Sequence, residues 1–140
     1  MQVKVTTNSA KIRAALKKES ATMKAKMQTG LSRVAQQGIN IIQDRMDSSQ
    51  TINGGRFKPY TEKYAAFRRA SGKQPHVNLQ FTRNMRNAMT TRASSKKAEI
   101  FFTTGDEAKK AAFNDKTRPF FGFSKDEITD LSKIFLRAIT

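Results

Sequence analysis

The chain has 140 residues, a formal net charge of +16 at pH 7, no cysteine and one histidine. This length predicts one domain, residues 1–140, that is large enough to bury a hydrophobic core. The lack of cysteine excludes disulfides and thiolate metal sites, and the single histidine excludes a metal site built from several histidines.

The charge favours an acidic partner such as nucleic acid or an acidic protein surface, although a basic surface that only keeps the protein soluble has the same composition. No run approaches the roughly 20 apolar residues of a membrane span, and the N-terminus lacks the apolar segment of a signal peptide. We therefore expect no membrane association and a location in the cytoplasm of the cell that makes the protein.

The first predicted elements are a strand and a long helix. Residues 2–7 (QVKVTT) alternate valine with polar residues, as in a short strand. From Ile12 to Met46, apolar residues recur at helical spacing between lysines and arginines. This pattern indicates one long amphipathic helix, or two helices separated near Glu19–Ala21 or Gly30.

A long loop, about residues 48–80, follows because the polar segment 47–55 (DSSQTINGG) cannot continue the helical pattern. Within the loop, residues 56–69 (RFKPYTEKYAAFRR) interleave aromatic and basic side chains, which is typical of single-strand nucleic-acid binders. The aromatic residues also recur at helical spacing, so a short packed helix over Thr61–Arg69 explains them equally well.

The segment after the loop predicts a helical turn and two strands. The turn is expected at Thr82–Ala88, and the strands at Met89–Ser94 and Ala98–Thr104, joined by a turn of their own. Glu107–Phe113 fits either a further strand or a helical turn.

The last helix is the best-defined element. Ser124 and Glu127 have the spacing of a capping box, which marks the start of a helix. Its expected inward stripe consists of Ile128, Leu131, Ile134, Phe135 and Ala138. Together the elements predict an α+β fold, in which a long N-terminal helix and a C-terminal helix pack on a small, mostly antiparallel sheet.

The turn before that helix contains an aromatic cluster, TRPFFGF. Pro119 keeps Arg118 extended, and Gly122 permits a tight turn or a close backbone approach. Phe120 and Phe121 can then point to different sides, one of them into the core. Arg118 is left beside the rings, where it can stack on an aromatic side chain or pair with an acid.

The sequence shows no constellation of residues for catalysis. His76 lies in a loop without a nucleophile motif, and Asp44 and Asp47 at a helix end are only a weak metal signal. No glycine-rich phosphate loop is present. We therefore expect a protein that is not an enzyme and that has no catalytic residue, no metal site and no cofactor.

Two ordered motif regions, Gly55–Met89 and Ala111–Glu127, resemble a known family. They are similar to the G-x-F-x-P-L-[ST]-x-x-Y region and the R-x-F-x-G-[LF]-S-x-x-[DE] region of the tail-completion, or virion morphogenesis, proteins of tailed bacteriophages. The residues that match the first region are Gly55, Phe57, Pro59, Tyr60, Thr61, Tyr64, Arg68, Arg69, Gly72, Leu79, Thr82, Met85 and Met89. Those that match the second are Arg118, Phe120, Gly122, Phe123, Ser124 and Glu127.

The chain departs from the family pattern at two places. Thr82-Arg83 stands where the family has a threonine–glycine pair, and FNDKT, Phe113–Thr117, replaces a longer loop that bears histidine and glycine. We therefore expect a different turn after Leu79 and a short loop before Arg118.

The resemblance implies a structural protein of the virion, located at the neck, where the head connector meets the tail tube. Such proteins form a ring, often a hexamer, around the channel that DNA crosses. The implied partners are further copies of the chain, the head connector or adaptor protein and the tail tube protein, with non-specific contacts to DNA in the channel. Assembly would take place in the cytoplasm of the bacterial host.

A ring needs a heterologous interface, in which one patch meets a different patch of the next copy. We expect the long loop to be mobile in the monomer and to order against a neighbour. Arg118 is expected to hold the turn before the last helix against the sheet rather than to contact a neighbour. The candidate interface residues are Arg56, Phe57, Tyr60, Tyr64, Arg68 and Arg69.

Two other functions stay open on the sequence alone. One is a sequence-independent nucleic-acid-binding protein, which salt-dependent DNA binding by a protein that stays monomeric would favour. The other is a small basic nuclease, which a loss of nuclease activity on changing His76 would favour.

Overall fold

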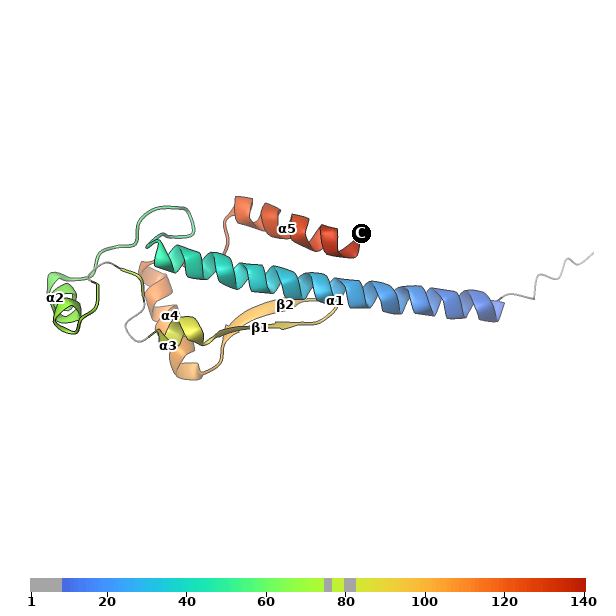
Figure 1. The fold of residues 1–140 in the computed structure, drawn as a ribbon, viewed down its shortest axis with the longest axis horizontal. Helices are drawn as coiled ribbons and strands as arrows, with labels where there is room; N and C mark the ends of the chain where they lie inside the picture. The colour runs from blue at the N-terminus through green and yellow to red at the C-terminus, as the bar shows by residue number, and fades with distance from the viewer. Residues whose placement is uncertain (1–8, 75–76, 80–82) are drawn as a thin grey trace, which may run out of the picture.

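A computed structural model describes residues 9–74, 77–79 and 83–140. The strand expected at residues 2–7 and the histidine, His76, lie outside the described residues. The elements are α1 (Ser9–Asp47), α2 (Glu62–Ala70), α3 (Asn84–Asn87), β1 (Met89–Ala93), β2 (Ala98–Phe102), α4 (Gly105–Thr117) and α5 (Lys125–Ile139). The predicted α+β class, with a long first helix and a capped last helix, is confirmed (Figure 1).

The first helix, α1, runs without interruption through both predicted break points and has 39 residues. Gly30 is not a break but a contact point with α5. A Cβ atom there would lie 3.0 Å from the Phe135 ring and 3.1 Å from the Ala138 methyl group, so the glycine lets the two helices approach closely. Among the helices of the described residues, none is long and apolar enough to cross a bilayer.

The sheet is a single antiparallel hairpin, in which β1 pairs with β2 from Met89 opposite Phe102 to Ala93 opposite Ala98. The hairpin lies along one side of the C-terminal half of α1, and α5 lies along another side (Figure 1). Burial is greatest where these elements meet α4 and the start of the long loop. The buried cluster comprises Ile39, Ile42, Met46, Phe57, Val77, Leu79, Met85, Met89, Ala111 and Phe120.

The last helix starts as predicted but buries a narrower face than predicted. The Ser124 hydroxyl accepts a hydrogen bond from the Glu127 N–H at 3.2 Å, and the Glu127 carboxylate accepts one from the Ser124 N–H at 2.8 Å, which completes the capping box. Leu131 is buried, but Ile128 is 52% exposed, so placing Ile128 on the inward stripe was wrong. The apolar stripe of α5 is therefore wider than the surface of α1 that it contacts.

Replacing Ser124 by alanine is expected to lower the free energy of unfolding by about 1 kcal/mol, because the Glu127 N–H in the first turn of α5 then loses its acceptor. Chemical denaturation followed by circular dichroism measures the change. Ser132→Ala is the matched control, since the Ser132 hydroxyl donates to the Ile128 carbonyl in the helix interior and caps nothing. Equal losses for the two variants would contradict the capping role.

The helix α4 corrects two predictions. Glu107–Phe113 is neither a strand nor a single turn but part of a 13-residue helix that Thr104 caps, its hydroxyl accepting from the Glu107 N–H at 3.3 Å. The same helix includes FNDKT, Phe113–Thr117, which was expected to be a short loop. The chain therefore enters the aromatic corner directly from a helix end.

Candidate assembly interface

The aromatic corner, residues 118–123, joins α4 to α5 and is held by one buried arginine of α1. Arg45 is 6% exposed and donates from Nη1 to the carbonyl oxygens of Phe120, at 2.6 Å, and Gly122, at 2.7 Å. Its Nη2 forms an ion pair with the Glu127 carboxylate, the same group that caps α5. Charge-assisted bonds of this kind are stronger than neutral ones, so Arg45 fixes the corner and the start of α5 to the end of α1.

Two further contacts satisfy the backbone of the corner. The Asp115 carboxylate, at the end of α4, accepts hydrogen bonds from the N–H groups of Phe120 and Phe121, both at 3.0 Å. The Ile52 N–H donates to the Pro119 carbonyl at 2.9 Å. As predicted, one ring enters the core, because Phe120 is fully buried while Phe121 lies at the core edge.

Gly122 makes the close approach that the sequence allowed. A Cβ atom at Gly122 would lie 2.9 Å from Cδ1 of Ile52, closer than real Cβ contacts come. The corner therefore packs directly against the first turn of the long loop.

Arg118 acts within the chain, as expected, but its partner is the long loop and not the sheet. Its Nε donates to the Lys58 carbonyl at 2.7 Å and its Nη2 to the Pro59 carbonyl at 3.2 Å. The guanidinium lies over the Tyr60 ring, 4.9 Å from the ring centroid. Stacking on a ring, rather than pairing with an acid, is thus what the structure shows for Arg118.

Arg68 organises the middle of the long loop from inside it. It is 1% exposed, donates to the Gln74 carbonyl at 2.8 Å and to the Asn78 side chain at 3.2 Å, and lies 5.1 Å from the Tyr60 ring centroid. Tyr64 meets Tyr60 edge to face, with centroids 4.9 Å apart. The predicted helix over Thr61–Arg69 is confirmed as α2, and Thr61 is its cap.

The six candidate interface residues therefore divide into two groups. Phe57 and Arg68 are buried within the chain, where they position the loop rather than present a surface. Arg56 and Arg69 are exposed, Tyr64 is at the border of exposure, and Tyr60 is half-buried between two arginines. The loop surface is consequently basic at its rim. Tyr60 contacts the loop's own arginines, whereas Tyr64 and Phe67 are 37% and 54% exposed and keep ring surface on which a base could stack.

Tyr60 carries a pH dependence that follows from this packing. Burial raises the pKa of its phenol above the ordinary value of 10.0, and the nearby Arg68 opposes the rise. Since the native state holds the phenolic proton more tightly than the unfolded chain, this contribution to stability is complete below pH 10 and is lost as the pH rises through the native pKa.

Tyrosinate absorbance is expected to show one of the two tyrosines ionising above the ordinary range, and Tyr60→Phe is expected to remove that late transition. The matched change Tyr64→Phe should leave it in place. A late transition that survives in Tyr60→Phe would contradict the assignment.

A cleft of about 490 Å³ opens between α2, α4 and the segment before α3. Its walls combine aromatic side chains with cations, and Glu107 also lines it. One Glu107 oxygen accepts from Lys110 at 3.0 Å, and the other is buried without a hydrogen-bond partner among the described residues. The cations and rings of the walls are Tyr60, Tyr64, Arg68, Arg83, Lys110, Phe113 and Arg118.

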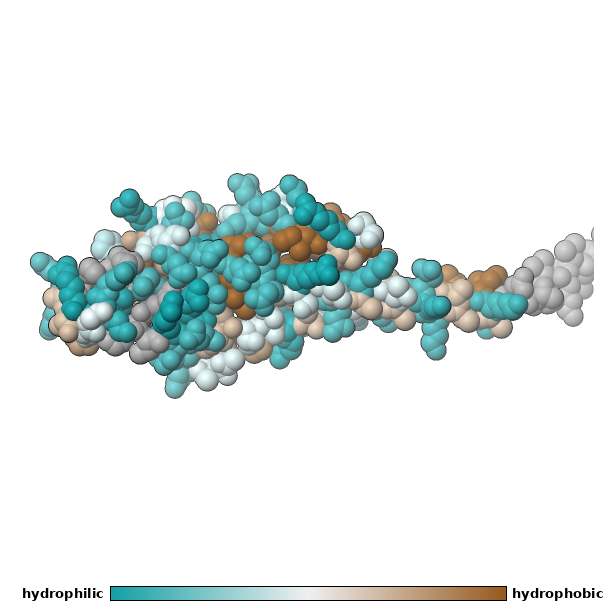
Figure 2. Space-filling model, viewed as in Figure 1, coloured by the Kyte–Doolittle hydropathy of each residue, from teal (hydrophilic) through white to brown (hydrophobic). Residues whose placement is uncertain are grey.

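A second surface was not singled out by sequence reasoning. The N-terminal part of α1, Ala10–Lys26, which we name the arm, extends beyond both the hairpin and α5, and all 17 of its residues are exposed (Figure 1). Its apolar residues Ile12, Leu16 and Met23 are 56%, 63% and 44% exposed. Apolar surface shows near the outer end of the arm and again along α5 (Figure 2).

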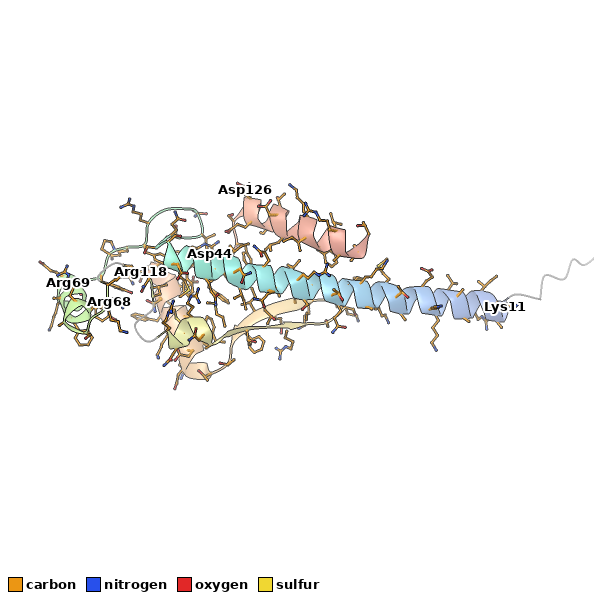
Figure 3. All side chains as sticks on the ribbon, in the orientation of Figure 1. Lys11, Asp44, Arg68, Arg69, Arg118 and Asp126 are labelled. Atoms are coloured by element: carbon orange, nitrogen blue, oxygen red, sulfur yellow. The ribbon has the colours of Figure 1, made fainter. Side chains whose placement is uncertain are left out.

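Basic residues lie at both ends of the molecule. Lys11 lies at the outer end of the arm, whereas Arg68, Arg69 and Arg118 lie at the opposite end of the molecule, on and near α2 (Figure 3). In the part of the chain that the structure describes, no three histidine or acidic side chains lie close enough together to hold a metal ion.

Searches of protein-family models, of curated proteins and of solved structures found no match to this chain.

Proposed function

We propose that this chain is a structural subunit of a tailed-bacteriophage particle, which completes the tail or joins head and tail at the neck, as one member of a ring around the DNA channel. The observation that carries the proposal is the arm. It is a basic helix that leaves Ile12, Leu16 and Met23 exposed, and a partner along it would bury these apolar residues.

A helix that packs against nothing adds little stability to a protein that works alone. An isolated helix of its length is marginal in water, since most helical stability in proteins comes from packing an amphipathic face. A subunit that assembles supplies that packing from a neighbour. A helix that projects from a packed domain is therefore typical of a subunit that assembles with others. Its basic surface suits either DNA or an acidic neighbouring ring.

The local structure at the motif residues also supports the proposal. The residues of the second region form one corner tied to α1, in which Gly122 lies so close to Ile52 that a larger residue would have to displace the end of that side chain. Arg83, where the family pattern has glycine, adopts a left-handed conformation with φ of 67°. Glycine adopts that conformation without strain, so the backbone here suits the residue that the resemblance expects.

The proposal is tested by disrupting the coding sequence in the bacteriophage genome that carries it. The expected result is a loss of infectious particles with an accumulation of unjoined heads and tails, restored when the intact chain is supplied in trans. Normal infectious particles from the disrupted genome would overturn the proposal.

A nucleic-acid-binding protein is the second candidate, and the charge of the arm favours it. Ala10–Lys26 contains six lysines and arginines and one acid. Binding through such a helix would weaken steeply with salt and show no sequence preference. A chain that binds DNA in this way, stays monomeric and is absent from virus particles would favour this function over the first.

A further inference from the structure

The cleft between α2 and α4 has exposed aromatic rings on both helices. Phe113, on α4, is 75% exposed and Tyr64, on α2, is 37% exposed, and both line the cleft. Phe67 extends the ring surface of α2, since it stacks on Tyr64 with centroids 6.0 Å apart and is itself 54% exposed. Single exposed rings are common on protein surfaces, but three rings at one cleft form a patch that indicates a ligand with an apolar or aromatic face.

The same cleft has an excess of positive charge. Its described lining includes four basic residues and one acid, a net charge of +3, namely Arg68, Arg83, Lys110, Arg118 and Glu107. Lys110 already pairs with Glu107. Arg118 is half-buried and donates to two carbonyl oxygens, which carry no net charge, and it forms no ion pair with any described residue. Its charge is therefore not balanced within the described chain and attracts an anion.

Rings and unbalanced cations together restrict the chemistry of the ligand. An acidic side chain would pair with the cations but leave the rings uncovered, and an apolar helix would cover the rings but bury the charge of Arg118 without a partner. A nucleotide supplies both groups, because its base has a π face and its phosphate is an anion that arginine binds well. The cleft volume of about 490 Å³ lies within the range of small-ligand sites.

We propose that the cleft binds an unpaired nucleobase together with its phosphate. The base stacks on Phe113 or Tyr64, and the phosphate lies beside Arg118 and Lys110. A double helix does not present this chemistry, because its bases are stacked on one another inside the duplex. A single-stranded segment of nucleic acid and a free nucleotide both present it.

This site is separate from the arm and from the proposed function. The arm, Ala10–Lys26, has no aromatic residue on which a base can stack. A structural subunit of a virus particle does not need a nucleotide site, so the inference goes beyond the proposed function, and each can fail without the other.

Two variants each remove one half of the site. Phe113→Ala removes a ring, and Lys110→Gln removes a charge but keeps an N–H group that can donate to Glu107. The Phe113 residue is 75% exposed and the Lys110 side chain 58%, so both variants should keep the circular dichroism and the unfolding midpoint of the wild-type chain. The controls are Leu136→Ala, at an exposed apolar residue of α5, and Lys109→Gln, at an exposed lysine of α4 outside the described lining of the cleft.

The probe is a 5′-phosphorylated thymidine tetranucleotide, which is short enough to draw little affinity from the charge of the arm. Isothermal titration calorimetry is expected to show binding to Phe113→Ala that is weaker by about fivefold or more, because one stacking contact is lost. Lys110→Gln is expected to weaken binding and to reduce the slope of log Kd against log salt concentration by about 0.7, the effect of one phosphate contact to a single strand. Both controls should bind as the wild-type chain does.

A tetranucleotide of abasic sugars is the matched ligand control, because it has the same phosphates but no bases. It is expected to bind the wild-type chain more weakly than the probe by about fivefold or more, and Phe113→Ala should discriminate less between the two strands. Thymidine 5′-monophosphate distinguishes the two sources of the base. Saturable binding of the monophosphate that both variants weaken indicates a free nucleotide, whereas binding of the tetranucleotide alone indicates a single strand.

Photo-cross-linking locates the base directly. Near-ultraviolet light joins 5-iodouracil to an aromatic ring on which it stacks, so a tetranucleotide with 5-iodouracil in place of one thymine is expected to become attached to Phe113 or Tyr64, as mapped by mass spectrometry. Equal affinity for the probe and the abasic strand, wild-type affinity in both Phe113→Ala and Lys110→Gln, or cross-links only outside the cleft would overturn the inference and leave the proposed function standing. A wild-type chain that binds neither the tetranucleotide nor the monophosphate would also overturn it.

Discussion

Replacing Arg45 by methionine is expected to lower the free energy of unfolding by about 3–5 kcal/mol. The change leaves the carbonyl oxygens of Phe120 and Gly122 without their donor and leaves Glu127 without its ion-pair partner. Methionine keeps most of the length and the helix propensity of arginine, so the loss reports on the bonds rather than on the volume or the helix. Urea denaturation followed by circular dichroism measures it.

The control is Arg33→Met, because Arg33 is exposed on the same helix. A change there is expected to stay within about 0.5 kcal/mol. If Arg45→Met and Arg33→Met had the same small effect, the rings alone would hold the corner, and Arg45 would not be the residue that fixes it to α1.

Replacing Phe120 by alanine is expected to cost a similar amount, about 3–5 kcal/mol, because its fully buried ring would leave a cavity in the core. Phe113→Ala is the matched control, since it deletes the same atoms from a ring that is 75% exposed. Equal unfolding midpoints for the two variants would contradict the burial of Phe120. Because the Phe120 carbonyl also accepts from Arg45, the two large losses are not expected to add in the double variant.

Secondary-structure elements were predicted well where a local residue pattern is compatible with only one type of element. The capping box at Ser124 and Glu127, the hairpin strands and the short helix capped by Thr61 all occur close to their predicted places. The length of α4 was underestimated. A start signal for this helix was present in the sequence, since Thr104 and Glu107 have the same spacing as the capping residues Ser124 and Glu127.

The buried arginines could not be identified with the same ease. Lys and Arg together number 27, and a pattern of charge does not say which of them leaves the solvent. Position offers a partial signal, since Arg45 follows Ile41 by four residues and so continues the predicted apolar stripe of α1, and Arg68 follows Tyr64 by four. The carbonyl partners of Arg45 lie 75 and 77 residues further along the chain and depend on the tertiary fold.

The exposure of the arm was not predictable either. Helical periodicity from Ile12 to Met46 is continuous, and it looks the same whether a stripe is covered by its own chain or by another molecule. The places where α5 and the hairpin end, near Gly30 and Gln28, divide α1 into a covered part and an uncovered part. The position of this boundary depends on the lengths of the helices and loops, and no local residue pattern encodes it.

The most direct test of the proposed function is a count of the copies of this chain in virus particles purified from bacteria that make it, measured by quantitative mass spectrometry against the major capsid protein. A ring at the neck predicts a small fixed number, about six copies per particle. Complete absence from the particles, or a number that varies with the DNA content of the preparation, would contradict the proposal.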